Sequence, residues 1–188
     1  MIRKFVVTLL FLFGLSIFLY PPVMKTYNDY AASRQSDAVS QQFQVDSEDQ
    51  MTAHQNFIHY NASLSGTSTI DSPPVEANKN QAAHLDANME NVIATIDIPA
   101  LDIHYPVFDK ATPDNLNRGV ARVEGTSYPV GGKPSNSVLA AHSYSPDHEW
   151  FTHIDKLRDG AIVIINNFEE TLYYKVSGRE IVSPCRSG

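Results

Sequence analysis

The chain has 188 residues, a formal net charge of −7, 43% hydrophobic residues and a single cysteine. This length predicts one domain of ordinary size with an additional tail, not two large domains. The composition excludes a fully disordered chain, and a lone cysteine excludes a small protein held together by disulfides. The net acidity argues against a nucleic-acid partner, because proteins that bind nucleic acids usually present a basic face.

The charge is divided unevenly along the chain. Residues 1–25 carry +3, residues 26–98 carry −8 and residues 99–188 carry −2. Together with the changes in composition, this division predicts three regions. They are an N-terminal membrane anchor over residues 1–25, an extracellular acidic stalk over residues 26–90 and a β-rich domain over residues 91–188.

The first region contains an uncharged run of 20 residues from Phe5 to Met24. A helix needs about 20 apolar residues to cross the hydrocarbon core, so the run predicts a single membrane pass. Arg3 and Lys4 precede it and favour a cytoplasmic N-terminus. The alternative is a cleaved signal peptide, but the run is long for one, and Tyr20-Pro21-Pro22 is a poor cleavage site. We therefore expect location at the cell membrane, with the domain on the extracellular face.

The second region, residues 26–90, is rich in Gln, Asn, Ser, Asp and Ala. This composition favours a solvated, partly helical spacer that holds the domain away from the membrane. One helical face is weakly marked by Tyr27, Tyr30, Ala31 and Val39. Turn and breaker residues from Tyr60 to Pro74 predict a loop.

The third region is rich in β-branched and aromatic residues and predicts about six short strands. The expected strands cover residues 91–98, 103–108, 117–123, 137–142, 161–165 and 171–176. Residues 149–157 are expected to form a short helix. The fold class expected is mainly β, a small barrel or sandwich. A barrel has to close to remove its exposed edges, and residues 184–188 have no strand character, so we expect the barrel to be incomplete at its C-terminal end.

Two segments of the third region carry the most specific motifs, EGTSYPVGGK at residues 124–133 and NSVLAAH at residues 136–142. Further segments extend the pattern on both sides: ATIDIP at 94–99, YPVF at 105–108, LNRGV at 116–120, FTHIDKL at 151–157 and ETLYYKV at 170–176. In this order and spacing, the segments resemble the sortase family, and within it the class C, pilus-building type.

The resemblance implies a cysteine transpeptidase with a β-barrel fold on the outer face of Gram-positive bacteria. Such enzymes cut an LPxTG-like sorting signal after its Thr, and class C members join that Thr to a Lys amine of the next pilin. The expected partners are therefore sorting signals of pilins or surface proteins, with no cofactor. The family uses a His, a Cys and an Arg, since the thiolate attacks the carbonyl, the His transfers protons and the Arg stabilises developing charge.

Carried onto this sequence, the resemblance assigns His142 as the catalytic histidine. The family's nucleophilic Cys follows that His by roughly sixty residues. Cys185 follows His142 by only 43 residues and lacks the Thr-Leu-x-Thr-Cys context, so it is a poor match. We therefore expect a sequence truncated before the catalytic Cys and Arg, and inactive as written. Asp71 and Pro73 stand where class C members carry a lid over the Cys, although an ordinary Pro-rich turn explains them equally well.

Two other interpretations remain open at this point. One is a non-enzymatic, membrane-anchored module that binds peptides or assists pilus assembly. The other is an active sortase that uses Cys185 at an unusual position. A metal site is not expected, because His148, His153 and Asp155 do not share one helical face.

Overall fold

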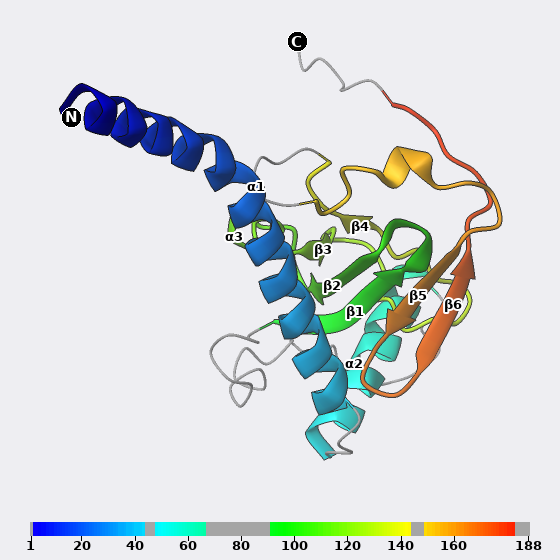
Figure 1. Cartoon of the computed structure of the whole chain (residues 1–188). Helices are drawn as coiled ribbons and strands as arrows, with labels where there is room; N and C mark the ends of the chain where they lie inside the picture. The colour runs from blue at the N-terminus through cyan, green and yellow to red at the C-terminus, as the bar shows by residue number, and fades with distance from the viewer. Residues whose placement is uncertain (1, 44–47, 67–90, 144–148, 183–188) are drawn as a thin grey trace, which may run out of the picture.

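The computed structural model describes residues 2–43, 48–66, 91–143 and 149–182. Two helices, α1 (Ile2–Phe43) and α2 (Glu48–Leu64), precede a curled six-stranded sheet that forms half of a barrel (Figure 1). The expectation of a mainly β fold needs correction, because α1 alone has 42 residues and α2 has 17. The fold is therefore mixed, with helices packed on a β-sheet.

All six expected strands are present. They are β1 (Val92–Ile98), β2 (Ile103–Phe108), β3 (Val120–Arg122), β4 (Leu139–Ala140), β5 (Ile162–Asn166) and β6 (Thr171–Lys175). Their order in the sheet is β4-β3-β2-β1-β5-β6, with β2 and β3 parallel and the other pairs antiparallel. The central strands β1 and β2 carry most of the buried residues of the sheet, so this pair forms the base of the core.

The helix expected at residues 149–157 is reduced to a single 3₁₀ turn, Ile154–Lys156. Trp150 has a φ of 32°, which lies outside right-handed helical geometry and prevents a continuous helix from its position. One further short helix, α3 (Pro113–Leu116), begins after Thr112, whose side chain accepts a hydrogen bond from the Asn115 backbone N–H at 3.3 Å.

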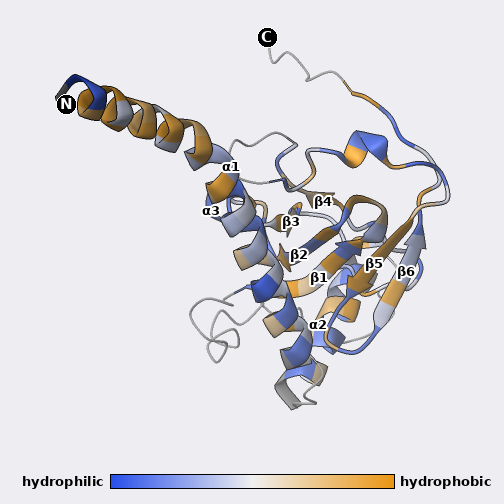
Figure 2. Ribbon diagram, in the orientation of Figure 1, coloured by the Kyte–Doolittle hydropathy of each residue, from blue (hydrophilic) through white to orange (hydrophobic). Residues whose placement is uncertain are grey.

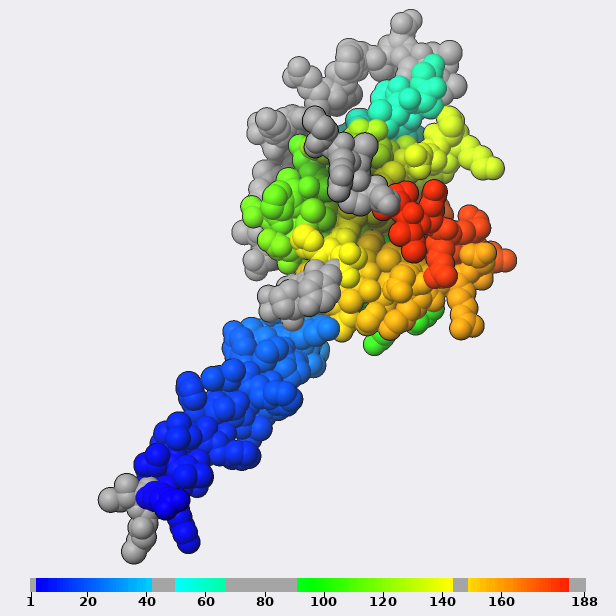
Figure 3. Space-filling view, turned by 90° about the horizontal axis from the view of Figure 1, so that it is seen from above, coloured from blue at the N-terminus to red at the C-terminus, as the bar shows by residue number. Residues whose placement is uncertain are grey.

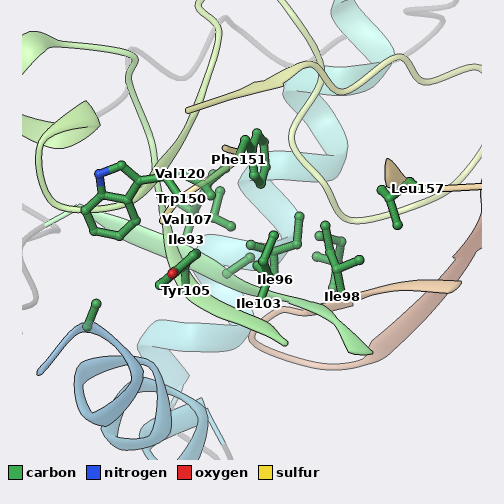
Figure 4. Close-up of a cluster of buried hydrophobic side chains, with 13 residues drawn as sticks. Ile93, Ile96, Ile98, Ile103, Tyr105, Val107, Val120, Trp150, Phe151 and Leu157 are labelled. Carbon is green, nitrogen blue, oxygen red and sulfur yellow. The ribbon is translucent and has the colours of Figure 1, made fainter. Parts of the chain in front are cut away.

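The main core lies on one face of the sheet, where β-branched side chains meet aromatic ones (Figure 4). Its fully or almost fully buried members include Ala94, Ile98, Val107, Val120 and Trp150. The burial of β-branched residues on both faces of β1 follows from its central place in the sheet, with helices and loops covering it. The core thereby fixes the strands from which the candidate site projects.

Helix α1 has an exposed apolar half and a half that packs on the sheet (Figures 1 and 2). The apolar half passes through Pro21 and Pro22 without ending, and by length and composition it is suited to span a membrane. The packed half buries Ala32, Ser36 and Val39 at helical spacing, and the two small residues allow close approach to the sheet. Of the face expected from the sequence, only Val39 is buried.

Helix α2 also lies against the domain. The Asn61 side chain donates to the Tyr128 carbonyl at 3.0 Å and accepts from the Tyr128 N–H at 2.7 Å. Phe57 stacks on the same Tyr128 ring, with centroids 3.9 Å apart. The helix ends at Leu64, so the loop expected from residue 60 begins later. The segment expected to be a solvated spacer thus contains the packed half of α1, which lies against the sheet, and α2, which packs on Tyr128.

A polar cluster joins α1 to the sheet. His104 on β2 contacts the Asp97 carboxylate through Nδ1, and its Nε2 lies 3.2 Å from Asp37 Oδ1 on α1. Asn166 of β5 donates to Asp97 Oδ2 at 2.9 Å. The hydrogen bond to Asp97 raises the pKa of His104 above its ordinary value of 6.5, despite the opposing effect of partial burial.

This raised pKa predicts a pH-dependent stability. A histidine with a raised folded-state pKa stabilises the fold fully below its unfolded value of 6.5, and that contribution is lost as the pH rises through the folded value. We expect the melting temperature to fall over this range, and to fall less in His104→Gln. Melting curves at a series of pH values give the slope of melting temperature against pH for the unmodified chain and for His104→Gln. His59→Gln, on the exposed face of α2, is the control. Equal slopes in His104→Gln and the unmodified chain would contradict the assignment.

Candidate active site

The candidate site is built around His142, two residues past the end of β4 at Ala140. β4 pairs with β3, and the Val123 N–H extends the pairing by donating to the Val138 carbonyl at 2.8 Å. The His142 side chain itself is exposed. The sequence therefore places an accessible imidazole at the end of a strand whose main chain is fixed by its neighbour.

A second contact fixes the main chain at His142 itself. The Phe151 N–H donates to the His142 carbonyl at 3.1 Å. Phe151 is buried, and the preceding residue, Trp150, is only 1% exposed. The Trp150 ring meets Tyr105 edge to face, with centroids 4.8 Å apart, on the side of the core toward α1 (Figure 4). Two buried aromatic residues thus anchor the segment that holds His142.

Helix α1 binds the same segment through an ion pair and a hydrogen bond to Glu149. Lys25 Nζ lies 2.5 Å from Glu149 Oε1, and the Glu149 backbone N–H donates to Asp29 Oδ1 at 3.2 Å. The Tyr105 hydroxyl donates to the same Asp29 oxygen at 3.4 Å. Burial, with a smaller contribution from the Asp29 carboxylate, raises the pKa of Tyr105, so Tyr105 remains a neutral donor. The turns of α1 at residues 25–29 are thereby connected to His142 through Glu149 and Phe151.

A buried arginine supports the strand beside β4. Arg122 of β3 is 3% exposed, and it donates to Asp109 Oδ1 at 2.8 Å and to the Thr126 carbonyl at 2.6 Å. Its guanidinium lies 4.0 Å from the Tyr128 ring centroid, a cation–π distance. These contacts occupy the guanidinium within the fold, so Arg122 supports the site and does not present its charge to a substrate.

The other residues predicted for the site, Asp71, Pro73 and Cys185, lie outside the described residues, as does His148. His153 Nε2 lies 3.5 Å from Glu149 Oε2, in the segment that α1 binds. Within residues 2–43, 48–66, 91–143 and 149–182, no three His, Cys, Asp or Glu side chains gather at metal-binding distance.

No pattern in the sequence predicts that Lys25 and Asp29 contact Glu149. Their partners are more than a hundred residues apart, and no local pattern relates such positions. The role of Asn61 was not predicted either, because a polar residue in a polar segment gives no sign of burial.

Comparison with known proteins identifies the domain. Residues 96–187 match the family model described as the sortase domain. No match was found among curated protein sequences.

Similar solved structures are mostly class C sortases. The type I crystal structure of Streptococcus agalactiae sortase C1 is 26% identical, with a TM-score of 0.66, covering 79% of this chain and 78% of that one. Clostridium perfringens sortase C with the C-terminal cell wall sorting motif is 28% identical, with a TM-score of 0.64, covering 80% and 78%. A lid mutant of Corynebacterium diphtheriae sortase A is 25% identical, with a TM-score of 0.59, covering 72% and 73%. The chain therefore contains a sortase domain, at residues 96–187.

Proposed function

We propose that the chain is a class C sortase module that recognises LPxTG-like sorting signals, with His142 as its catalytic histidine. In the complete reaction, a cysteine thiolate attacks the Thr carbonyl, and the acyl group is then transferred to a Lys amine of a pilin. The observation that carries the proposal is the position of His142, exposed two residues past β4 and within one of the most specific motifs. The class C character of most similar structures supports it.

The geometry around His142 suits proton transfer. Its carbonyl accepts a hydrogen bond from Phe151, whereas its ring is exposed. A general acid needs this combination, because it has to reach the leaving amine without losing its orientation. In the proposed reaction, His142 gives a proton to the departing Gly amine and later takes one from the incoming Lys amine.

The nucleophile sets the activity that we propose for the 188-residue polypeptide itself. Its one cysteine, Cys185, stands 43 residues after His142, short of the spacing that the resemblance implies. We propose that this polypeptide is a sortase without transpeptidase activity. A non-enzymatic peptide-binding or pilus-assembly role is the alternative that the position of Cys185 favours.

We also propose that α1 anchors the protein in the cell membrane, with the domain on the outer face. The uncharged run and the two basic residues before it support this orientation. A signal sequence would share these features, so retention of residues 1–25 in the mature protein tests the anchor. The described residues after position 25 would then form one extracellular body, because α1 contacts β1 and β2 and α2 is hydrogen-bonded to Tyr128.

Nuclear magnetic resonance of the histidine side chains tests recognition directly. Titration of the full chain with an LPxTG-like peptide is expected to shift the imidazole signals of His142, which His142→Asn identifies by their loss. His59, exposed on α2, provides the internal control. A shift of His142 alone, absent with a scrambled peptide, is the expected result. Unchanged His142 signals at saturating peptide, or equal shifts with the scrambled peptide, would contradict the proposal.

A further inference from the structure

Helix α1 presents two different faces just beyond its apolar run. One face holds the domain, through Lys25, Asp29 and Ala32. The opposite face carries an exposed apolar and aromatic set, named here the outer stripe: Tyr20, Val23, Tyr27 and Tyr30, each between 60% and 65% exposed. Figure 3 shows the N-terminal part of α1 projecting from the domain. This helix therefore connects its own apolar run with the domain.

Helical geometry places the two faces on opposite sides. At about 100° per residue, Lys25, Asp29 and Ala32 cluster around one direction, and the four stripe residues cluster about 180° away. The outer stripe begins inside the uncharged run and continues six residues past Met24. It is therefore an unbroken extension of the surface that would face lipid, on the side of α1 that the domain leaves uncovered.

The depth of the stripe agrees with the polar layer of a bilayer. With a rise of about 1.5 Å per residue, Tyr27 lies about 4.5 Å and Tyr30 about 9 Å beyond Met24. The headgroup layer on each side of the hydrocarbon core is about 5–8 Å thick. Side chains on a helix lean toward its N-terminus, which here points into the membrane, so the Tyr30 ring reaches back into this layer. Tyrosine is enriched at such interfaces, since its ring is apolar and its hydroxyl is polar.

We propose that the outer stripe binds the headgroup region of the bilayer and seats the domain directly on the membrane surface. The partner is the phospholipid bilayer that residues 5–24 enter, and the inference rests on the proposed membrane anchor. Continuity with that run favours the bilayer over a protein partner.

The seating has a consequence for the candidate site. Lys25 is the first residue after Met24, and its ion pair with Glu149 brings the segment 149–151 to the same level. His142 is joined to this segment through Phe151. The candidate site accordingly lies near the membrane surface, and a sorting signal would have to reach it close to the bilayer.

Depth measurement on the full chain tests the proposal. In a Cys185→Ser background, single cysteines replace Val23, Tyr27, Tyr30 or Ala38 and carry an environment-sensitive fluorophore. The protein is placed in vesicles of phosphatidylcholine and phosphatidylglycerol, with a nitroxide on a fraction of the lipid headgroups. Ala38 is the matched control, because it is exposed on the same face of α1, three turns past Tyr27. Quenching of the intrinsic fluorescence of Trp150, the only tryptophan, reports without a label how close the segment next to Glu149 lies to the membrane surface.

The expected result is quenching at positions 23, 27 and 30 that is several-fold stronger than at position 38, with measurable quenching of Trp150. Labels at 27 and 30 as weakly quenched as the label at 38, with position 23 still quenched, would overturn the seating and leave the anchor intact. Absence of quenching at all four positions, with no flotation of the protein with vesicles, would overturn the anchor and the seating together.

Discussion

Replacement of Trp150 by alanine is expected to lower the free energy of unfolding by about 3–5 kcal/mol, the range for large aromatic residues removed from a core. Trp150 is 1% exposed, and its ring packs against Tyr105 and the residues around it. The substitution removes that ring and leaves a cavity, because β2, which carries Tyr105, is held in the sheet and cannot move in to fill the space. Urea denaturation followed by circular dichroism measures the change, since the variant has no tryptophan fluorescence.

Two further variants make this prediction specific. Trp150→Phe keeps an aromatic ring and is expected to retain much of the stability. Ile154→Ala, in the same segment but at a side chain that is 39% exposed, is expected to cost well under half as much. A loss in Trp150→Ala no larger than that in Ile154→Ala would show that the segment 149–157 is not anchored through its tryptophan.

The strands of the domain were predictable because their signals are local. β1, β2, β5 and β6 are short β-branched or aromatic runs bounded by turn residues, and each lies within a few residues of its expected position. β3 and β4 are shorter than expected, since the Pro- and Gly-containing segment at 128–134 connects them and their pairing covers only two residues of each.

The helices were less predictable because their packing depends on distant partners. The buried face of α1 uses Ala32 and Ser36, whose small size, and not their hydropathy, allows contact with the sheet. Exposed Tyr27 and Tyr30 gave a stronger apolar signal and directed the expected face to the wrong side of the helix. The end of α2 was misplaced for a related reason, since buried Asn61 lies in a segment that is polar in sequence.

The candidate site divides in the same way. The family motif indicated His142. The structure adds the contacts that hold its main chain, a hydrogen bond from Phe151 and the binding of Glu149 by α1. The contacts between α1 and Glu149 involve Lys25 and Asp29, charged residues of the kind common on protein surfaces. Neither composition nor spacing therefore predicts them. Tertiary structure was needed to connect the proposed membrane helix with the candidate catalytic histidine.

The activity of the polypeptide is the second prediction with a large effect, and it tests the account most directly. The full 188-residue chain in detergent is incubated with an LPxTG-like peptide and a Lys-containing acceptor, and the products are identified by mass spectrometry. We expect neither cleavage after Thr nor a Thr–Lys product, because Cys185 does not stand at the spacing of the family's nucleophile. We expect the same result for Cys185→Ala. Sustained cleavage that disappears in both Cys185→Ala and His142→Ala would contradict the account and identify Cys185 as the working nucleophile.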